Sequence, residues 1–583
     1  MSFKRLSVFV AGLAALASPA PAGAQIAAGA FPKTAFSDCD GYGKPSKSGD
    51  GMTEQAFTMG IFVPLNGRGD TTKTSVLAGP EGVKACDAAL ADPMLLPRYA
   101  VRRATLLRAR ALHRLASGAP DAALADLDAA LKALPAGDRY AERSVGFGAE
   151  LVRGMALIQA GRVEEGRAAT ATAADLRPYN RQALRSAALM ADVYESPVAE
   201  RERLLRAQAR LDPETLGRLF DFLIEQGRFQ EAIDLHPQLK PVLEKGGAER
   251  YDFEVRILAA KNEAIGEAFW AGKAGPLAYA HAALGRPEEA RRTLETARER
   301  LKAATGPVPP RLNSQGKPKK PDVADQYTEI YRKALAKTGA ETFDRWAPVV
   351  EARSALAAGR REGAEALAGP QSKGVPASVS ADFVRAYRAA LPEVERAKLV
   401  PEPPAPSIWS ALSGLTREQL VSSALLQTLP EAELTAQIPA YKDAPHPRFS
   451  MKNSYNDLAV VGYRSETDPK TGVTTVRVRT GKGSSSVPEE MALLRAAELA
   501  EQAGKRFLIV DRRDYRHVYS VTHYGAVMNS SPDGFSTEID ILFFDPAQPP
   551  AGYEAAAWRA FDPAQVRAAL GSAYPPAPAG KAS

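Results

Sequence analysis

The pattern of apolar and polar positions divides the chain into a long helical region and a shorter region of strand-like alternation. Residues 98–400 carry apolar side chains at helical spacing almost throughout. Residues 441–575 change to short runs in which apolar and polar residues alternate, as half-buried strands require. Between them, residues 401–440 begin with a proline-rich run typical of a stiff spacer and continue into a predicted helix. The chain is therefore predicted to be mainly α, with a small α/β domain before a loose tail at 576–583.

The helical region has an internal period. A glycine stands at a predicted turn, and a second small residue follows five positions later. This spacing occurs five times, at Gly118 and Ala123, Gly161 and Gly166, Gly227 and Ala232, Gly285 and Ala290, and Gly359 and Ala364. The glycine makes the turn between two helices, and the small residue lets the helices approach closely. A further helical pair at 180–213 lacks the turn glycine, and a Pro- and Lys-rich segment at 305–321 interrupts the series.

These spacings resemble those of the tetratricopeptide repeat family, over about half of the chain. The resemblance implies a tetratricopeptide-type α-solenoid, split near 305–321, whose first helices line a concave groove for a protein or peptide partner. The register places six residues on or near this groove: Arg108, Leu112, Leu151, Met155, Met190 and Tyr194. Because only Arg108 among them is basic, we expect an apolar helix or strand as the guest rather than a clamped C-terminal carboxylate. The alternative is that these side chains pack between neighbouring repeats.

The C-terminal region predicts a small sheet with one helix on a face. The elements occur in the order β-β-α-β-β, with strands at 458–461, 474–478, 507–510 and 539–544 and a helix at 488–503. The run at 493–499, followed by Gly504-Lys-Arg-Phe507 and a strand ending at Asp511, resembles the single domain of a family of small bacterial envelope lipoproteins. That resemblance covers about 110 residues and brings no catalytic residues with it. This chain departs from the family in having no cysteine for lipid attachment.

The N-terminus predicts a cleaved signal peptide at residues 1–24. Lys4 and Arg5 precede a short apolar run at 6–17, and an Ala-Gly-Ala triplet ending at Ala24 is typical of a cleavage site. The alternative is an anchor helix, but a bilayer requires about 20 apolar residues. We therefore expect a periplasmic or secreted protein that begins at Gln25 and has no transmembrane segment.

The segment at 25–97 is predicted to be irregular, apart from one helix near 83–90. It contains both cysteines of the chain, Cys39 and Cys86. Exported thiols tend to pair, so we expect a disulfide, which would stabilise the fold by about 3–4 kcal/mol. The alternative is two separate buried thiols.

Charge and motifs favour binding over catalysis. The formal charge of +7 over 583 residues is mild and forms no dense basic block, so nucleic acid is not an expected partner. The chain has no recognisable metal, phosphate-loop or nucleophile motif, and we expect no metal and no cofactor. The best catalytic candidates are Asp511, Asp514, His517 and His523, which could supply a general base. The other interpretation of these residues is a charged strand end that keeps the sheet edge from associating.

The sequence therefore predicts a periplasmic scaffold that is not an enzyme and that binds a protein or peptide. An envelope hydrolase with its active site in the C-terminal domain is the main alternative. A repeat protein that associates with itself is a third.

Overall fold

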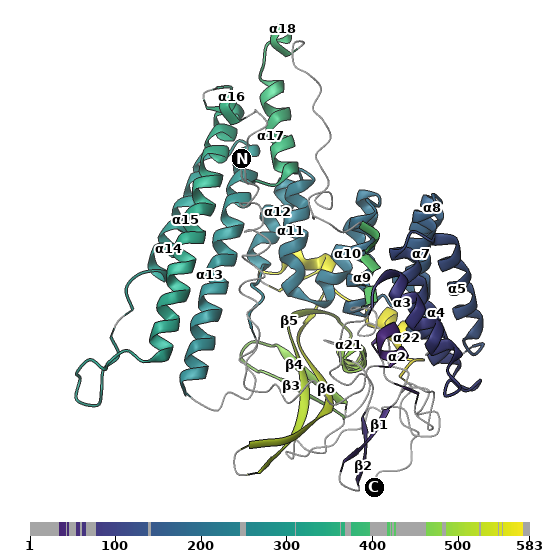
Figure 1. Ribbon diagram of the computed structural model, residues 1–583. Helices are drawn as coiled ribbons and strands as arrows, with labels where there is room; N and C mark the ends of the chain where they lie inside the picture. The colour runs from purple at the N-terminus through teal and green to yellow at the C-terminus, as the bar shows by residue number, and fades with distance from the viewer. Residues whose placement is uncertain are drawn as a thin grey trace.

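The structure, a computed structural model, is mostly helical and has a small antiparallel sheet near the C-terminus (Figure 1). It describes residues 34–41, 44–45, 54–58, 61–65, 77–137, 141–244, 252–308, 310–361, 363–367, 375–396, 417–419, 421–422, 425–426, 462–480, 485–523, 526–545, 547–550 and 552–574. The predicted signal peptide, the strand at 458–461, the tail at 576–583 and most of the linker at 401–440 lie outside these residues. Among the described helices, none is both long and apolar enough to cross a membrane.

Consecutive helices form hairpins that follow one another across the molecule (Figure 1). The pairs are α4 (Ala100–Ala116) with α5 (Pro120–Ala133), α7 (Phe147–Gln159) with α8 (Val163–Leu176), α9 (Arg181–Val193) with α10 (Val198–Leu211), and α11 (Leu216–Glu225) with α12 (Phe229–Leu235). A short π-helical turn, η2 (Glu142–Gly146), leads into α7, and 3-10 turns η3 (Pro213–Thr215) and η4 (His236–Gln238) precede α11 and follow α12. The helical pairs expected from the glycine spacing are therefore present.

The turn glycines explain why these hairpins form. Each lies two residues beyond the end of a first helix, with φ between 70° and 82°, a conformation that costs a glycine little: Gly118, Gly161, Gly227, Gly285 and Gly359. The small residue five positions later is buried against the first helix in every case. At Gly166, for example, a Cβ atom would lie 2.5 Å from the carbonyl oxygen of Gly154. In the α9–α10 hairpin, which lacks the glycine, Glu195 takes the same place with φ 51°.

Three longer helices form a bundle beside the hairpins: α13 (Asp252–Ala283), α14 (Pro287–Ala304) and α15 (Val323–Ala357). Glycines allow close packing inside it, because Trp346 lies directly over Gly275 and Leu301 over Gly339. The predicted interruption at 305–321 is the connection between α14 and α15. Shorter helices α16 (Ala364–Leu367), α17 (Ala377–Ala389) and α18 (Glu393–Arg396) follow.

The N-terminal segment is more regular than predicted. Besides α3 (Gly79–Ala91), which matches the expected helix, it contains α2 (Ala35–Asp40) and a hairpin of β1 (Glu54–Thr58) and β2 (Ile61–Leu65). The expected disulfide is confirmed, since Cys39 in α2 and Cys86 in α3 are joined at 2.05 Å. Both sulfur-bearing side chains are fully buried, and α3 packs on α4. The bridge thus fixes this segment to the first hairpin.

The C-terminal domain has the predicted β-β-α-β-β order. Its elements are β3 (Gly462–Thr467), β4 (Thr474–Thr480), α21 (Ser486–Gln502), β5 (Arg506–His523) and β6 (Ala526–Phe544), followed by η6 (Glu554–Arg559) and α22 (Pro563–Leu570). The four strands are antiparallel in the order β3-β4-β6-β5, and α21 covers one face. The prediction that a strand ends at Asp511 is wrong. A bulge separates Ile509 from Asp511, and β5 then continues along β6 to His523, because the charged residues beyond the bulge still pair with β6.

Candidate functional site

The C-terminal domain docks on one edge of the hairpin array, the edge formed by the loops between successive hairpins (Figure 1). Arg210, at the end of α10, donates from Nη2 to the carbonyl oxygen of Ala560 at 3.0 Å. Lys240, which follows η4, donates from Nζ to the carbonyl oxygen of Val510 at 2.7 Å. The array and the α/β domain therefore form one packed body.

A fully buried carboxylate lies at the centre of this contact. Glu490, on the first turns of α21, accepts on Oε1 from Nη2 of Arg177 at 2.6 Å. Its Oε2 accepts from Nη2 of Arg143 at 2.7 Å and from the Tyr574 hydroxyl at 2.8 Å. Burial alone would raise the pKa of Glu490, but the guanidinium groups of Arg143 and Arg177 outweigh it and hold the pKa below its ordinary value. A buried charge thus joins the domain to the array.

The neighbouring Glu489 extends the network to the start of the next hairpin. Its Oε1 accepts from the backbone N–H of Arg181, the first residue of α9, at 2.8 Å and from Nη1 of Arg512 at 3.1 Å. A carboxylate at a helix N-terminus also interacts favourably with the helix dipole. Arg181 and Arg512 each contact Asp514 at 2.9 Å. Although burial would raise the pKa of Asp514, these two cations hold it well below its ordinary value.

The structure places the two aspartates of the hydrolase hypothesis in different surroundings. Asp514 belongs to the buried network and also accepts from the Thr537 hydroxyl at 2.8 Å. Asp511 lies instead at the edge of the domain, 3.8 Å from Nζ of Lys240. His517 and His523 are in β5, but their side chains lie outside the described residues. Sequence reasoning missed the arginines of the helical region that pair with this domain, because no local pattern links residues that are 300 positions apart.

The six predicted groove residues are all buried, with relative exposures between 0% and 7%. Leu112, Leu151, Met155, Met190 and Tyr194 belong to one continuous apolar core that also includes side chains of α21. Arg108 lies on α4 and is buried as well. In this structure, therefore, these six side chains lie in the interior of the protein and are not accessible to an external partner.

Part of the covering comes from the segment 417–426, which lies between the helical region and the C-terminal domain in the sequence. Of this segment the structure describes residues 417–419, 421–422 and 425–426, which are helical. Val421 and Leu425 are buried in the same core as Met190 and Tyr194. Arg417 lies over the ring of Tyr194, 6.0 Å from its centroid, and 3.8 Å from the carboxylate of Glu195.

Contact with this segment also affects the chemistry of Tyr194. Burial raises the pKa of its hydroxyl, and the nearby carboxylate of Glu418 raises it further. The hairpin that meets the segment is the one whose turn carries Glu195 in place of glycine. A residue other than glycine with φ 51° is strained, and such strain often marks a functional position.

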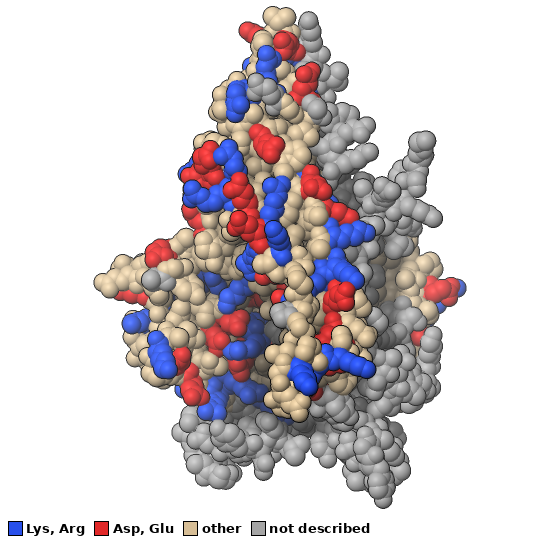
Figure 2. Space-filling view, turned by 90° about the vertical axis from the view of Figure 1, so that its left-hand side faces the viewer, with Lys and Arg blue, Asp and Glu red and all other residues tan. Residues whose placement is uncertain are grey.

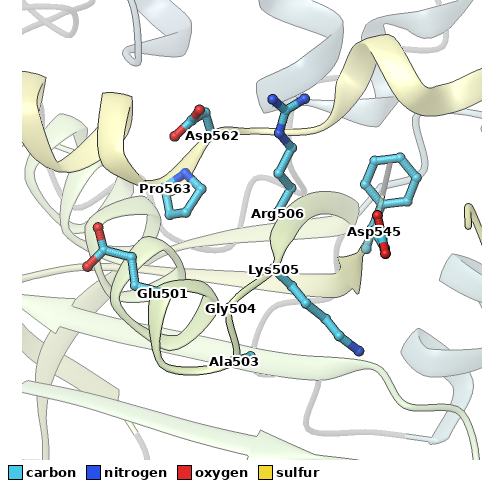
Figure 3. Close-up of a pocket in the computed structure, with 9 residues that line it drawn as sticks. Glu501, Ala503, Gly504, Lys505, Arg506, Asp545, Asp562 and Pro563 are labelled. Atoms are coloured by element: carbon cyan, nitrogen blue, oxygen red, sulfur yellow. The ribbon is translucent and has the colours of Figure 1, made fainter. Parts of the chain in front are cut away.

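A surface hollow of about 580 Å³ lies elsewhere on the C-terminal domain, between the end of α21, the start of β5 and the start of α22 (Figure 3). Lys505 and Arg506 face outward from the turn after α21, with Glu501, Asp545 and Asp562 around them. Its charges are of both signs, and none of the predicted site residues lines it.

No family model, curated protein or solved structure matches the chain.

Proposed function

We propose that the chain is an exported tetratricopeptide-type scaffold that binds an apolar helix of a protein partner in the groove of its hairpin array. The observation that carries this proposal is the burial of the chain's own Val421 and Leu425 in the core that contains predicted groove residues, beside the contact of Arg417 with Tyr194. Val421 and Leu425 are four residues apart, so they lie on the same face of a helix. An amphipathic helix usually binds in a groove through apolar residues at this spacing.

The segment would then act as an internal competitor of the partner. It is tethered to the array, so its effective concentration at the groove is on the order of millimolar, and an external helix must displace it. Two contacts hold its N-terminal end, the ion pair of Arg417 with Glu195 and the stacking of Arg417 on Tyr194. Both contacts are partly exposed to solvent, so each contributes little free energy. Weak contacts of this kind allow an external helix to displace the segment.

Peptide binding in trans tests the groove. In the opened variant, Val421→Asp with Leu425→Asp, the segment should leave the groove. A synthetic peptide of residues 415–428 should then bind this variant at least tenfold more tightly than it binds the wild-type chain, measured by fluorescence anisotropy. The same peptide carrying both Asp substitutions is the matched control and should bind neither protein. Equal binding to both proteins, or no binding to a folded opened variant, would contradict the proposal.

Glu195 offers a gentler test. Glu195→Gly removes both the strained backbone conformation and the ion pair with Arg417. We expect folding to be stabilised by about 0.5–1 kcal/mol, because glycine adopts positive φ without cost. Residues 417–426 should at the same time become more sensitive to protease. Unchanged protease sensitivity would show that Glu195 does not hold the segment.

A further inference from the structure

The lower end of the α13–α15 bundle exposes many large apolar side chains. They come from the residues before α13, the first turn of α13, the connection after α14 and the first turns of α15: Val242, Leu243, Phe253, Val255, Val308, Leu312, Val323, Tyr327 and Ile330. Ile330 is 57% exposed and Tyr327 43%. Val323, Tyr327 and Ile330 are spaced at i, i+4 and i+7, so they form one apolar stripe along α15. A patch of this kind marks an interaction surface.

A finger of chain projects beside this stripe. It is built by backbone hydrogen bonds from Asn313 to Lys317 at 2.8 Å and from Lys319 to Arg311 at 2.7 Å, with Gly316 in the turn at φ 76°. Leu312 is 56% exposed on it. Lys317, Lys319 and Lys320 are exposed, and none of them pairs with an acidic group in the described part of the chain.

The acidic residues named below, in contrast, each have a cationic partner. Arg311 contacts both Asp322 and Asp325, at 2.7 Å and 2.9 Å, and Arg256 bridges the same two carboxylates. Other pairs are Asp252 with Arg256, Glu244 with Lys261, Glu263 with Arg332, and Glu329 with Lys333. These pairs place six carboxylates against five cations, so the three lysines of the finger bring the net charge of the named groups to +2, next to apolar surface. Figure 2 shows this side of the molecule, with basic residues beside uncharged surface near the lower end of the bundle.

We propose that this end of the bundle docks on a membrane surface that contains anionic phospholipids. Lysines near such a surface attract its headgroups, while aromatic and aliphatic side chains enter the interface and need no hydrogen-bonding partner there. The apolar side chains belong to the N-terminal ends of α13 and α15 and to the connection that follows α14, and these segments meet at the lower end of the bundle (Figure 1). This function is independent of the proposed groove, because α21 and the segment 417–426 lie in a different part of the molecule.

Vesicle cosedimentation tests the proposal with the mature full-length chain. The chain should bind vesicles in which about one lipid in three is the anionic phosphatidylglycerol and the rest is phosphatidylcholine. It should not bind vesicles of phosphatidylcholine alone. Each lysine contributes about fivefold near an anionic surface. Because Lys317→Glu, Lys319→Glu and Lys320→Glu remove three attractions and add three repulsions, together they should weaken partitioning by more than about a hundredfold. Tyr327→Ser with Ile330→Ser should weaken it severalfold while leaving the dependence on lipid charge intact.

Two variants serve as matched controls. Lys84→Glu, Lys132→Glu and Lys470→Glu change the net charge equally at exposed sites outside the bundle, and Met94→Ser with Val198→Ser removes two exposed apolar side chains elsewhere. Both should bind as the wild type does. The proposal is overturned if the finger variant partitions like its control, or if neutral and anionic vesicles bind equally. It is also overturned if the Tyr327 and Ile330 substitutions abolish a concentration-dependent oligomer in sedimentation equilibrium without affecting vesicle binding, since the surface would then join two copies of the chain.

Discussion

The body formed by the hairpins and the C-terminal domain uses its charges differently from the α13–α15 bundle. In the body, Glu490 is fully buried and compensated by two arginines and a tyrosine from distant parts of the chain. In the bundle, charged pairs such as Arg300 with Glu267 and Lys333 with Glu329 lie on the surface, and apolar side chains are exposed between them. In the body, therefore, the buried charges are paired within the chain. The bundle, in contrast, leaves apolar side chains exposed and available for a partner.

The comparison shows where sensitivity to mutation should be concentrated. Removing one partner of a buried ion pair leaves the other charge without compensation, which is costly, whereas exposed pairs contribute little. Buried charges thus make the docking of the C-terminal domain specific, and the surface of the bundle can vary without loss of the fold.

The largest effect is expected for Glu490→Gln. This substitution keeps the shape of the side chain but leaves Arg143 and Arg177 buried without their counter-charge, and it should lower the free energy of unfolding by about 3–5 kcal/mol. Urea denaturation followed by circular dichroism measures it. Glu501→Gln, on the exposed side of the same helix, should cost less than about 1 kcal/mol. If the two variants are equally stable, the buried network does not hold the domain.

Loss of the disulfide should come next. Because Cys39 and Cys86 are 47 residues apart, replacing both by Ser should reduce stability by about 3–4 kcal/mol. The loss should appear in the unfolding of the body, while Trp346 fluorescence in the bundle, recorded in a variant whose other three tryptophans are replaced by Phe, reports little change. A single transition in which both probes shift together would show that the two regions unfold as one unit.

A smaller effect is expected from pH at the junction between the two regions. His236 packs against Phe220 of α11 and Trp270 of α13, and burial, with a contribution from His281 and Lys273, lowers its pKa to about 4. The unfolded chain then binds more protons than the folded chain, so stability should be full above pH about 6.5 and fall as the pH approaches 4.

The variant His236→Phe keeps the aromatic packing without titrating. Between pH values of about 7 and 5, its urea midpoint should therefore fall less than that of the wild type. This range spans the ordinary pKa of histidine, at which the unfolded wild-type chain takes up a proton. An identical fall in the two proteins would assign the pH dependence to other groups.

The smallest effect is expected at the exposed end of the bundle. Ile330→Ser should change the free energy of unfolding by no more than about 0.5 kcal/mol, because the side chain makes few contacts to lose. Thermal unfolding of the isolated protein checks this. A loss above about 2 kcal/mol would mean that Ile330 is part of the core, and the contrast between the two regions would not hold.

Local signals in the sequence were sufficient for the helical hairpins, although not for α2 or for the hairpin of β1 and β2. The turn glycines and the small residues after them predicted the hairpins, because both requirements, positive φ and close approach, lie within a few residues. Even the hairpin without a glycine was recognisable as a helical pair, although the strained Glu195 in its turn was not. The disulfide was predictable from compartment and number of cysteines, without any knowledge of geometry.

The contacts between distant segments could not be predicted in this way. Glu489 and Glu490 had the appearance of ordinary acidic residues in the first turn of a helix, and their pairing with Arg177 and Arg181 depends on how whole domains dock. The repeat register placed Met155 and Met190 on the first helices of their hairpins. It does not predict which other segments of the chain bury these two side chains. Similarly, the length of β5 was hidden by charged residues whose partners lie on β6.

The position of Glu490 late in the chain has a consequence for biogenesis. Arg177 is synthesised 313 residues before the carboxylate that compensates it, and Tyr574, another partner of that carboxylate, comes later still. Until α21 and the residues up to Tyr574 have been synthesised, Arg143 and Arg177 lack the groups that compensate them in the folded chain. We therefore expect an array made without Glu490 to be more sensitive to protease than the chain that contains it.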